Sequence, residues 1–143
     1  MFNKTLQKTV DGIIIKMIEY QLESGLQYTV SDNAPDTFER LKAESTPTRL
    51  VVWSGASESS IWGLEGNYLF RAIHDSIHLQ FDLSFDDMHE AEVCYITCKL
   101  LGLNEVERNV MVAEIIGQLE YKNAHGDFPA DQREFIQTYL KEA

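Results

Sequence analysis

The chain has 143 residues, of which 44% are hydrophobic and 24% are charged, and this balance is ordinary for a globular protein with one sizeable core. Twelve Lys and Arg residues stand against 23 Asp and Glu residues, which gives a formal net charge of −11. A surface of this sign repels a phosphate backbone, so the composition argues against general nucleic-acid binding. We expect a single domain over residues 1–143.

The hydrophobic residues are distributed in short groups. No stretch approaches the roughly 20 uninterrupted apolar residues that a membrane-spanning helix needs, so we expect no membrane insertion. The N-terminal residues Met1 to Glu19 include polar side chains where a signal peptide has its apolar segment. We therefore expect a cytoplasmic protein.

The first half of the chain predicts one long helix and a small sheet. From Lys4 to Ser24 apolar residues recur at three- and four-residue spacing, which is typical of a helix with one buried face, and Gly25 ends it. The run Arg49–Trp53 is rich in β-branched and aromatic residues and predicts a strand. Residues 28–30 are its expected partner in a two-stranded element, with a brief helix over residues 36–43 between them.

The second half predicts helices separated by turns. The Gly- and Ser-rich stretch from Ser54 to Gly66 is expected to be a loop. Ser84 has the position of a helix N-cap, and Asn104 with Glu107 forms a second capping pattern. The helices are expected over residues 67–79, 84–101, 104–124 and 129–140. The predicted fold class is mainly α, a compact bundle of four to five helices with a small two-stranded β element near the N-terminal half.

The two cysteines, Cys94 and Cys98, lie four residues apart in a predicted helix. They share one helix face and are poorly placed for a disulfide. We expect both thiols to be reduced and buried, packed with Tyr95 and Leu101 on the inner side of the helix. A pair of metal-binding thiolates is the alternative.

A pair of histidines is the first sign of a chemical site. His74 and His78 are four residues apart in a predicted helix, which places both imidazoles on one face within reach of one ion. Such pairs also arise by chance as surface or capping histidines. Carboxylates near the pair favour the metal interpretation, because Asp75 follows His74 directly and Asp82 lies two turns beyond it.

Polar residues in a second predicted helix point to the same site. Glu114 and Gln118 interrupt an otherwise apolar run, and a carboxylate or an amide is costly to bury without a partner. A metal ion is one such partner. The alternative is a buried structural network of these two residues with Arg71 and Tyr121.

These observations predict a site for a divalent metal ion, with Zn, Mn, Fe or Ni favoured over Ca by the mixture of imidazole and carboxylate ligands. Asp75 or Glu90 is expected to orient or deprotonate a metal-bound water, and Arg71 to bind an anionic substrate or to balance the charge of the acids. The predicted metal ligands are His74, His78 and Glu114, and the predicted supporting residues are Asp82 and Gln118.

Several segments, taken in order, resemble an uncharacterised family of phages and bacteria that has the pattern FRA-(I/V)-HD…H…E…E-x-x-GQ. The segments that carry this resemblance are Tyr28-Thr-Val-Ser-Asp-Asn, Leu50-Val-Val-Trp, Leu69-Phe-Arg-Ala-Ile-His-Asp75, His78, the Glu90 region, Glu114-Ile-Ile-Gly-Gln118 and Gly126-Asp-Phe-Pro129. The resemblance covers nearly the whole chain. It implies a shared polar site and a phage origin, but no substrate.

Two metal-dependent classes carry related motifs. His74-Asp75-Ser-Ile-His78 is similar to the helix of the HD phosphohydrolases, but these take a further upstream His, and this chain has none before residue 74. Glu114 or Glu90 would have to replace it. The zinc peptidases carry His-Glu-x-x-His, and here Asp75 is one methylene shorter than the Glu that acts as their general base.

Two functions follow from the sequence. The first is a metal-dependent hydrolase, with a phosphoester favoured because of the incomplete HD motif. The second is a non-catalytic acidic interaction protein, such as a phage inhibitor of a basic host partner, in which the polar site is structural. The expected partners are accordingly a small anionic substrate or a host protein. The expected location of the chain is the cytoplasm, which is the host cytoplasm for a phage-encoded protein.

Overall fold

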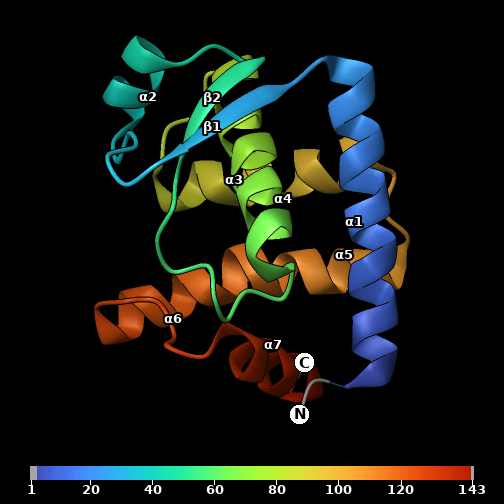
Figure 1. The fold of residues 1–143 in the computed structure, drawn as a ribbon. Coiled ribbons are helices and arrows are strands. Elements are labelled where there is room, and N and C mark those ends of the chain that lie inside the picture. Colours follow the sequence, from blue (N-terminus) through green and yellow to red (C-terminus); the bar gives the residue numbers. More distant parts are fainter. Residues whose placement is uncertain (1–2, 143) are drawn as a thin grey trace.

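The structure is a computed structural model that describes residues 3–142. Figure 1 shows helix α3 (Gly63–Gln80) at the centre, with the two-stranded sheet across its upper part and α1 (Lys4–Ser24) along one side. A long helical segment that starts with α5 (Glu105–Val112) crosses below α3, and α7 (Gln132–Glu142) lies beneath it. This arrangement confirms the predicted fold class, mainly helical with a small sheet near the N-terminal half.

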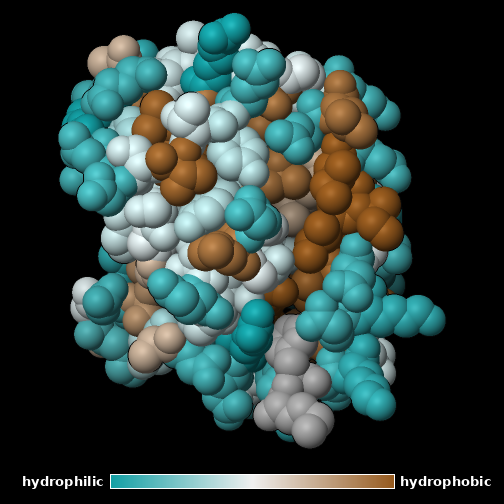
Figure 2. Space-filling view, viewed as in Figure 1, coloured by the Kyte–Doolittle hydropathy of each residue, from teal (hydrophilic) through white to brown (hydrophobic). Residues whose placement is uncertain are grey.

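Helix α1 has a polar residue at its start and a glycine at its end. The side chain of Asn3 accepts hydrogen bonds from the backbone N–H groups of Thr5 and Leu6. Gly25 ends the helix with a φ of 71°, a left-handed conformation that glycine adopts without strain. Both boundaries agree with the sequence prediction. Figure 2 shows apolar side chains along α1, where Ile15 and Leu22 are exposed.

The strands β1 (Gln27–Ser31) and β2 (Arg49–Trp53) pair in parallel, with Thr29 beside Val51. Helix α2 (Phe38–Glu44) lies in the crossover between them, as parallel strands require a long connection. The inner residues of β2 are buried against α3. The sheet therefore fixes the position of the C-terminal end of β2 relative to α3.

Helix α3 begins inside the stretch that was predicted to be a loop. The hydrophobic side chains of Ile61 and Trp62 are buried directly before its first residue, Gly63. The Ser60 side chain accepts a hydrogen bond from the Trp62 N–H and holds this turn. The predicted loop extends too far, to Gly66, because the Ser- and Gly-rich composition of this stretch outweighed the two hydrophobic residues, Ile61 and Trp62.

Helix α4 (Asp87–Leu101) is capped by Asp86, whose carboxylate accepts a hydrogen bond from the His89 N–H. The prediction that Ser84 is the N-cap is wrong, since the Ser84 hydroxyl instead donates to Asp86 at 2.7 Å. The helix ends at Gly102, as predicted.

Residues 105–125 form one continuous helical segment that contains a π-helical turn. The capping box of Asn104 and Glu107 is present at its start. The π-helical turn Ala113–Gly117 follows α5, and α6 (Gln118–His125) completes the segment. The apolar spacing of the sequence continues through this turn and did not predict it.

A cluster of buried hydrophobic residues from α1, β2, α3, α4 and α5 forms the core. Cys94 and Cys98 belong to it as free, buried thiols, which confirms that part of the prediction. Leu101 is buried with them, but Tyr95 is 64% exposed, so the prediction that it packs on the inner side is wrong. Within residues 3–142, no helix combines the length and the apolar character needed to cross a membrane.

Candidate metal centre and adjoining cavity

Three side chains from two helices bring their ligand atoms together. Helix α3 contributes His74 and His78 from successive turns, and the first turn of α4 contributes Glu90. The two Nε2 atoms are 3.1 Å apart, and Glu90 Oε1 lies 3.1 Å from His74 Nε2 and 2.6 Å from His78 Nε2. Tetrahedral ligands around a zinc ion are about 3.3 Å apart, so the group needs only a small expansion to hold such an ion.

The backbone after α3 fixes the orientation and the tautomer of His78. Its Nδ1 atom lies 2.7 Å from the carbonyl oxygen of Leu83. A carbonyl only accepts hydrogen bonds, so Nδ1 carries a proton and donates it, and Nε2 is the ring atom that is left to bind an ion. A second ring nitrogen that donates in this way is the usual support of a metal-binding histidine.

The side chain of Asp82 is exposed in the turn after α3, and the structure does not bring it to His78. Asp82 instead adopts a φ of 52°. In this turn the Leu83 N–H donates a hydrogen bond to the carbonyl oxygen of His78, with 3.0 Å between nitrogen and oxygen. The orienting role expected of the Asp82 carboxylate belongs to the Leu83 carbonyl. Asp82 contributes through its backbone conformation.

Two polar atoms of the group lack ordinary hydrogen-bond partners. Glu90 Oε1 is buried without a hydrogen bond of normal geometry, although it lies close to two imidazoles, and His74 Nδ1, on the far side of its ring from the centre, is buried without a partner as well. Buried polar atoms are nearly always paired, and buried charges are paired or bind metals. The position of Oε1 between two Nε2 atoms therefore fits a centre at which one ion would be shared by all three.

The charges of the group are strongly coupled. Burial opposes the ionised form of Glu90, but the attraction of the imidazoles of His74 and His78 at close range outweighs it and lowers the pKa of Glu90 to about 2. Burial likewise opposes protonation of His74, but the Glu90 carboxylate raises the pKa of His74 above its ordinary value. The site thus keeps a carboxylate charged and attracts a positive charge, either a proton or a metal ion.

Asp75 lies beside this group but is not part of it. Among the described residues, the cluster whose ligand atoms lie within 4.8 Å of one another contains His74, His78 and Glu90. Burial raises the pKa of Asp75 to about 6, while the neighbouring imidazoles lower it. Its role in proton transfer stays a prediction.

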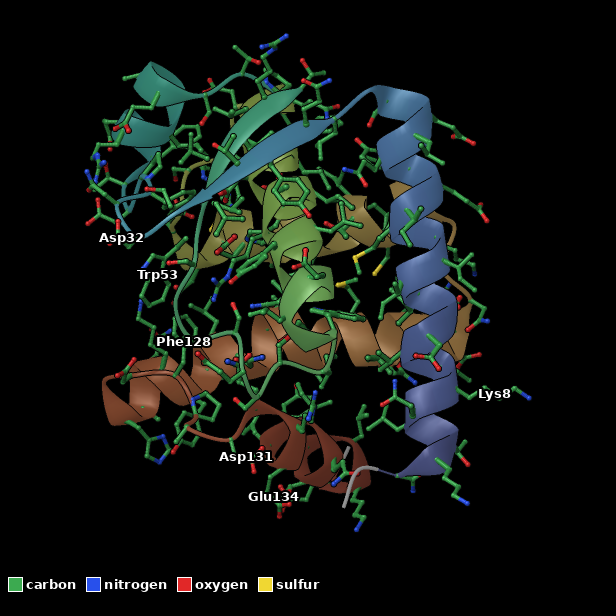
Figure 3. The ribbon with its side chains drawn as sticks, in the orientation of Figure 1. Lys8, Asp32, Trp53, Phe128, Asp131 and Glu134 are labelled. Atoms are coloured by element: carbon green, nitrogen blue, oxygen red, sulfur yellow. The ribbon has the colours of Figure 1, made fainter. Side chains whose placement is uncertain are left out.

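A cavity of about 280 Å³ adjoins the ligand group. His74 and Glu90 line it, so at least two of the three ligands border open space. Trp53 and Phe128 line it as well, and Figure 3 shows these two aromatic side chains on the same side of the molecule. Phe70 stacks between Trp62 and the ring of His74, with ring centroids 5.5 and 5.8 Å away, and forms an aromatic part of the wall.

Glu114 lines the same cavity from the π-helical turn. Gln118 donates a hydrogen bond to its carboxylate, and the Trp62 indole lies near enough to favour the charged form. Burial outweighs these contacts and Arg71, and raises the pKa of Glu114 to about 7. Glu114 is not part of the ligand cluster among the described residues, and Glu90 has the third position that the sequence predicts for Glu114.

Arg71 brings a positive charge to the cavity and is held rigidly. Its guanidinium donates to the backbone carbonyls of Trp53 at 2.5 Å, Gly55 at 2.7 Å and Ala56 at 3.4 Å. These bonds use three of the five N–H groups of the side chain. Burial lowers the pKa of Arg71, while Asp75 and Glu114 raise it. The guanidinium is therefore fixed on the cavity wall.

One signal in the sequence identifies Glu90 as a neighbour of the histidines. The connection from α3 to α4 contains only residues 81–86, so the first turn of α4 lies close to the last turns of α3.

Tyr121 was expected in a buried network with Glu114 and Gln118. It belongs instead to a stacked pair with His125, at 4.0 Å between ring centroids, and is not among the cavity residues.

Comparison of the chain with models of protein families, with curated proteins and with solved structures finds no match, so the geometry of these residues alone supports the functional conclusions.

Proposed function

We propose that this chain is a metal-dependent hydrolase whose divalent ion is held by His74, His78 and Glu90. The observation that carries the proposal is the convergence of two Nε2 atoms and one carboxylate oxygen at 2.6 to 3.1 Å beside an open cavity. Two imidazoles and one carboxylate form a ligand set known from catalytic zinc sites. This donor set suits Zn, Mn, Fe or Ni better than Ca.

The position of the cavity favours a catalytic over a structural ion. A structural ion is enclosed by protein ligands, whereas a catalytic ion keeps one position open for water or substrate. His78 is fully buried, but His74 and Glu90 face the cavity, so a further ligand can approach from that side. This access supports the hydrolase over a non-catalytic interaction protein.

The buried acids beside the ligand group would supply the proton transfer once an ion is bound. A bound divalent ion lowers the pKa of its water, and an enzyme base then needs a pKa near the working pH. Glu114 has this property, since burial raises its pKa to about 7, and it lines the cavity. We assign Glu114 as the base that removes the proton from water, with Asp75 as the nearby second acid.

A phosphoester is the favoured substrate. Arg71 places a fixed guanidinium on the cavity wall, and two of its N–H groups are not used by the three bonds to backbone carbonyls. A guanidinium matches the oxygen geometry of a phosphate group and stabilises its charge. An ion held by His74, His78 and Glu90 would therefore share with Arg71 the neutralisation of a phosphate bound in this cavity.

Metal binding is tested first, on protein purified without a His tag. We expect about one equivalent of Zn²⁺ or Mn²⁺ in the wild type and a large loss in Glu90→Gln, measured by elemental analysis and by titration calorimetry. Glu92→Gln is the matched control, because Glu92 is an exposed acid on the same helix. Equal metal binding by all three proteins contradicts the ligand assignment.

Catalysis is tested next with a panel of phosphate monoesters and diesters. We expect metal-dependent hydrolysis that Glu114→Gln reduces by about 10²-fold or more, as loss of a general base does. Metal content should be unchanged in this variant because Glu114 lies outside the ligand cluster. A metal-loaded wild type that is inactive on the whole panel contradicts the phosphoester assignment.

A further inference from the structure

The mouth of the cavity presents two aromatic rings to solvent. Trp53 ends β2 and is 49% exposed, and Phe128 follows α6 and is 48% exposed. Both line the cavity beside the ligand group. Large aromatic side chains usually bury most of their surface, and a flat ligand group that stacks on them removes this surface from water. The two rings thus offer a surface suited to a planar ligand group.

Each of these rings also carries a cation. The guanidinium of Arg71 lies 5.3 Å from the centroid of the Trp53 ring, and Lys122 Nζ lies 4.9 Å from that of Phe128. The chain has a net charge of −11, so a cation on the cavity wall, Arg71, and a second one over the lining residue Phe128, Lys122, stand out against the overall charge. They attract an anionic ligand to this opening against the repulsion of the rest of the surface.

The amide side chains of the wall are oriented as hydrogen-bond acceptors. Gln132 donates its NH₂ group to the carbonyl oxygen of Ala56 at 2.9 Å, and Gln118 donates to the Glu114 carboxylate. Turning Gln132 around would bring two oxygens together, and turning Gln118 around would do so when Glu114 is ionised. The two bonds leave the oxygen atoms of Gln118 and Gln132 unused, and both residues line the cavity, so these oxygens can accept N–H groups of a ligand.

We propose that this cavity binds an organic phosphate whose alcohol part is a flat aromatic group that carries N–H donors. The ring stacks on Trp53 and Phe128, its N–H groups donate to Gln118 and Gln132, and the phosphate lies toward Arg71 and the metal ligands. This inference rests on the proposed function, since it names the substrate class of the same site.

Unreactive phosphonates separate binding from turnover. The probes are phenylphosphonate, 3-aminophenylphosphonate and butylphosphonate, each titrated into zinc-loaded protein by calorimetry. We expect phenylphosphonate to bind about tenfold more tightly than butylphosphonate, as expected for one aromatic stacking contact, and the amino group to add about threefold more. Equal affinities for the phenyl and butyl probes, or no binding of any probe, overturn the inference.

Variants test whether the predicted residues cause the preference for an aromatic phosphonate. Phe128→Ala should lower the ratio of phenyl to butyl affinity toward one, and Phe128→Leu serves the same test if the first variant is unstable. Phe81→Ala is the matched control, since Phe81 is 47% exposed and lies outside the cavity lining. Gln132→Leu should remove only the gain from the amino group. An unchanged ratio in the Phe128 variants overturns the aromatic subsite.

The two proposals fail in different ways. Selective binding of aromatic phosphonates without hydrolysis of any ester supports this inference and overturns the proposed function. Hydrolysis of phosphate esters with no preference for an aromatic group supports the proposed function and overturns this inference.

Discussion

Replacement of Glu114 by Gln should change how the stability of the metal-free protein depends on pH. The pKa of the buried carboxyl is raised from 4.5 to about 7, so the folded protein keeps it protonated where the unfolded chain has ionised it. Its contribution to stability is therefore complete below about pH 4.5 and is lost as the pH rises through about 7. The gap between these two pKa values corresponds to about 3 kcal/mol in the free energy of unfolding.

The assay is urea unfolding in the presence of a chelator, followed by circular dichroism at several pH values between 4.5 and 8. Glu114→Gln keeps the shape of the side chain and a partner for Gln118, but it cannot ionise. We expect the wild type to lose about 3 kcal/mol more than this variant between the two ends of the range. Glu92→Gln, which removes an exposed carboxylate, should follow the wild type.

Parallel curves for the wild type and Glu114→Gln would refute the reasoning. They would mean that the carboxyl is already ionised in the folded protein and that Arg71 and the Trp62 indole offset its burial. Glu114 would then have no pKa near neutrality, and its assignment as the general base would be wrong.

Three further predictions concern the site and its surroundings. His74→Ala should abolish metal binding but lower the melting temperature only slightly, because the apolar core does not depend on an ion. Metal analysis and thermal unfolding measure these two effects, and loss of cooperative unfolding contradicts the prediction. Cys94 and Cys98 should react with a thiol reagent slowly in the native protein and rapidly in urea, and fast native labelling opposes this. Gly117→Ala should lower the free energy of unfolding by about 1–3 kcal/mol, measured in urea, because the added Cβ lies 2.9 Å from the Tyr139 ring. Unchanged stability would show that this ring moves freely.

The histidine pair could be predicted from sequence because both residues belong to one helix. A spacing of four residues fixes two side chains on one face whatever the rest of the chain does, and His74 and His78 do lie 3.1 Å apart. The third ligand atom depends on how two helices pack. Glu90 and Glu114 are equally compatible with the sequence pattern, and only the short turn after α3 places Glu90 beside the pair.

The fold shows the same division between local and long-range information. Helix ends marked by Gly25, Gly102 and the Asn104 capping box were predicted well, because capping involves only neighbouring residues. The choice of Asp86 over Ser84 as a cap was missed, since both residues have a suitable side chain. The parallel pairing of β1 and β2 depends on the path of the chain between them, which no local pattern records.

The π-helical turn Ala113–Gly117 bears on how this cavity can arise and be lost during evolution. Such a turn contains one residue more than an α-helical turn, and each residue of an α-helix rotates the chain by about 100°. Deletion of a single residue here would restore a regular α-helical turn. Because one complete turn of either kind returns the chain to the same direction, α5 and α6 would keep their orientations, and the change would be confined to the turn that carries Glu114. A related chain that lacks this residue would keep the metal ligands on α3 and α4 but present a different side chain from this turn to the cavity. The insertion thus allows the acid beside the metal centre to change in one mutational step, without change at the metal centre.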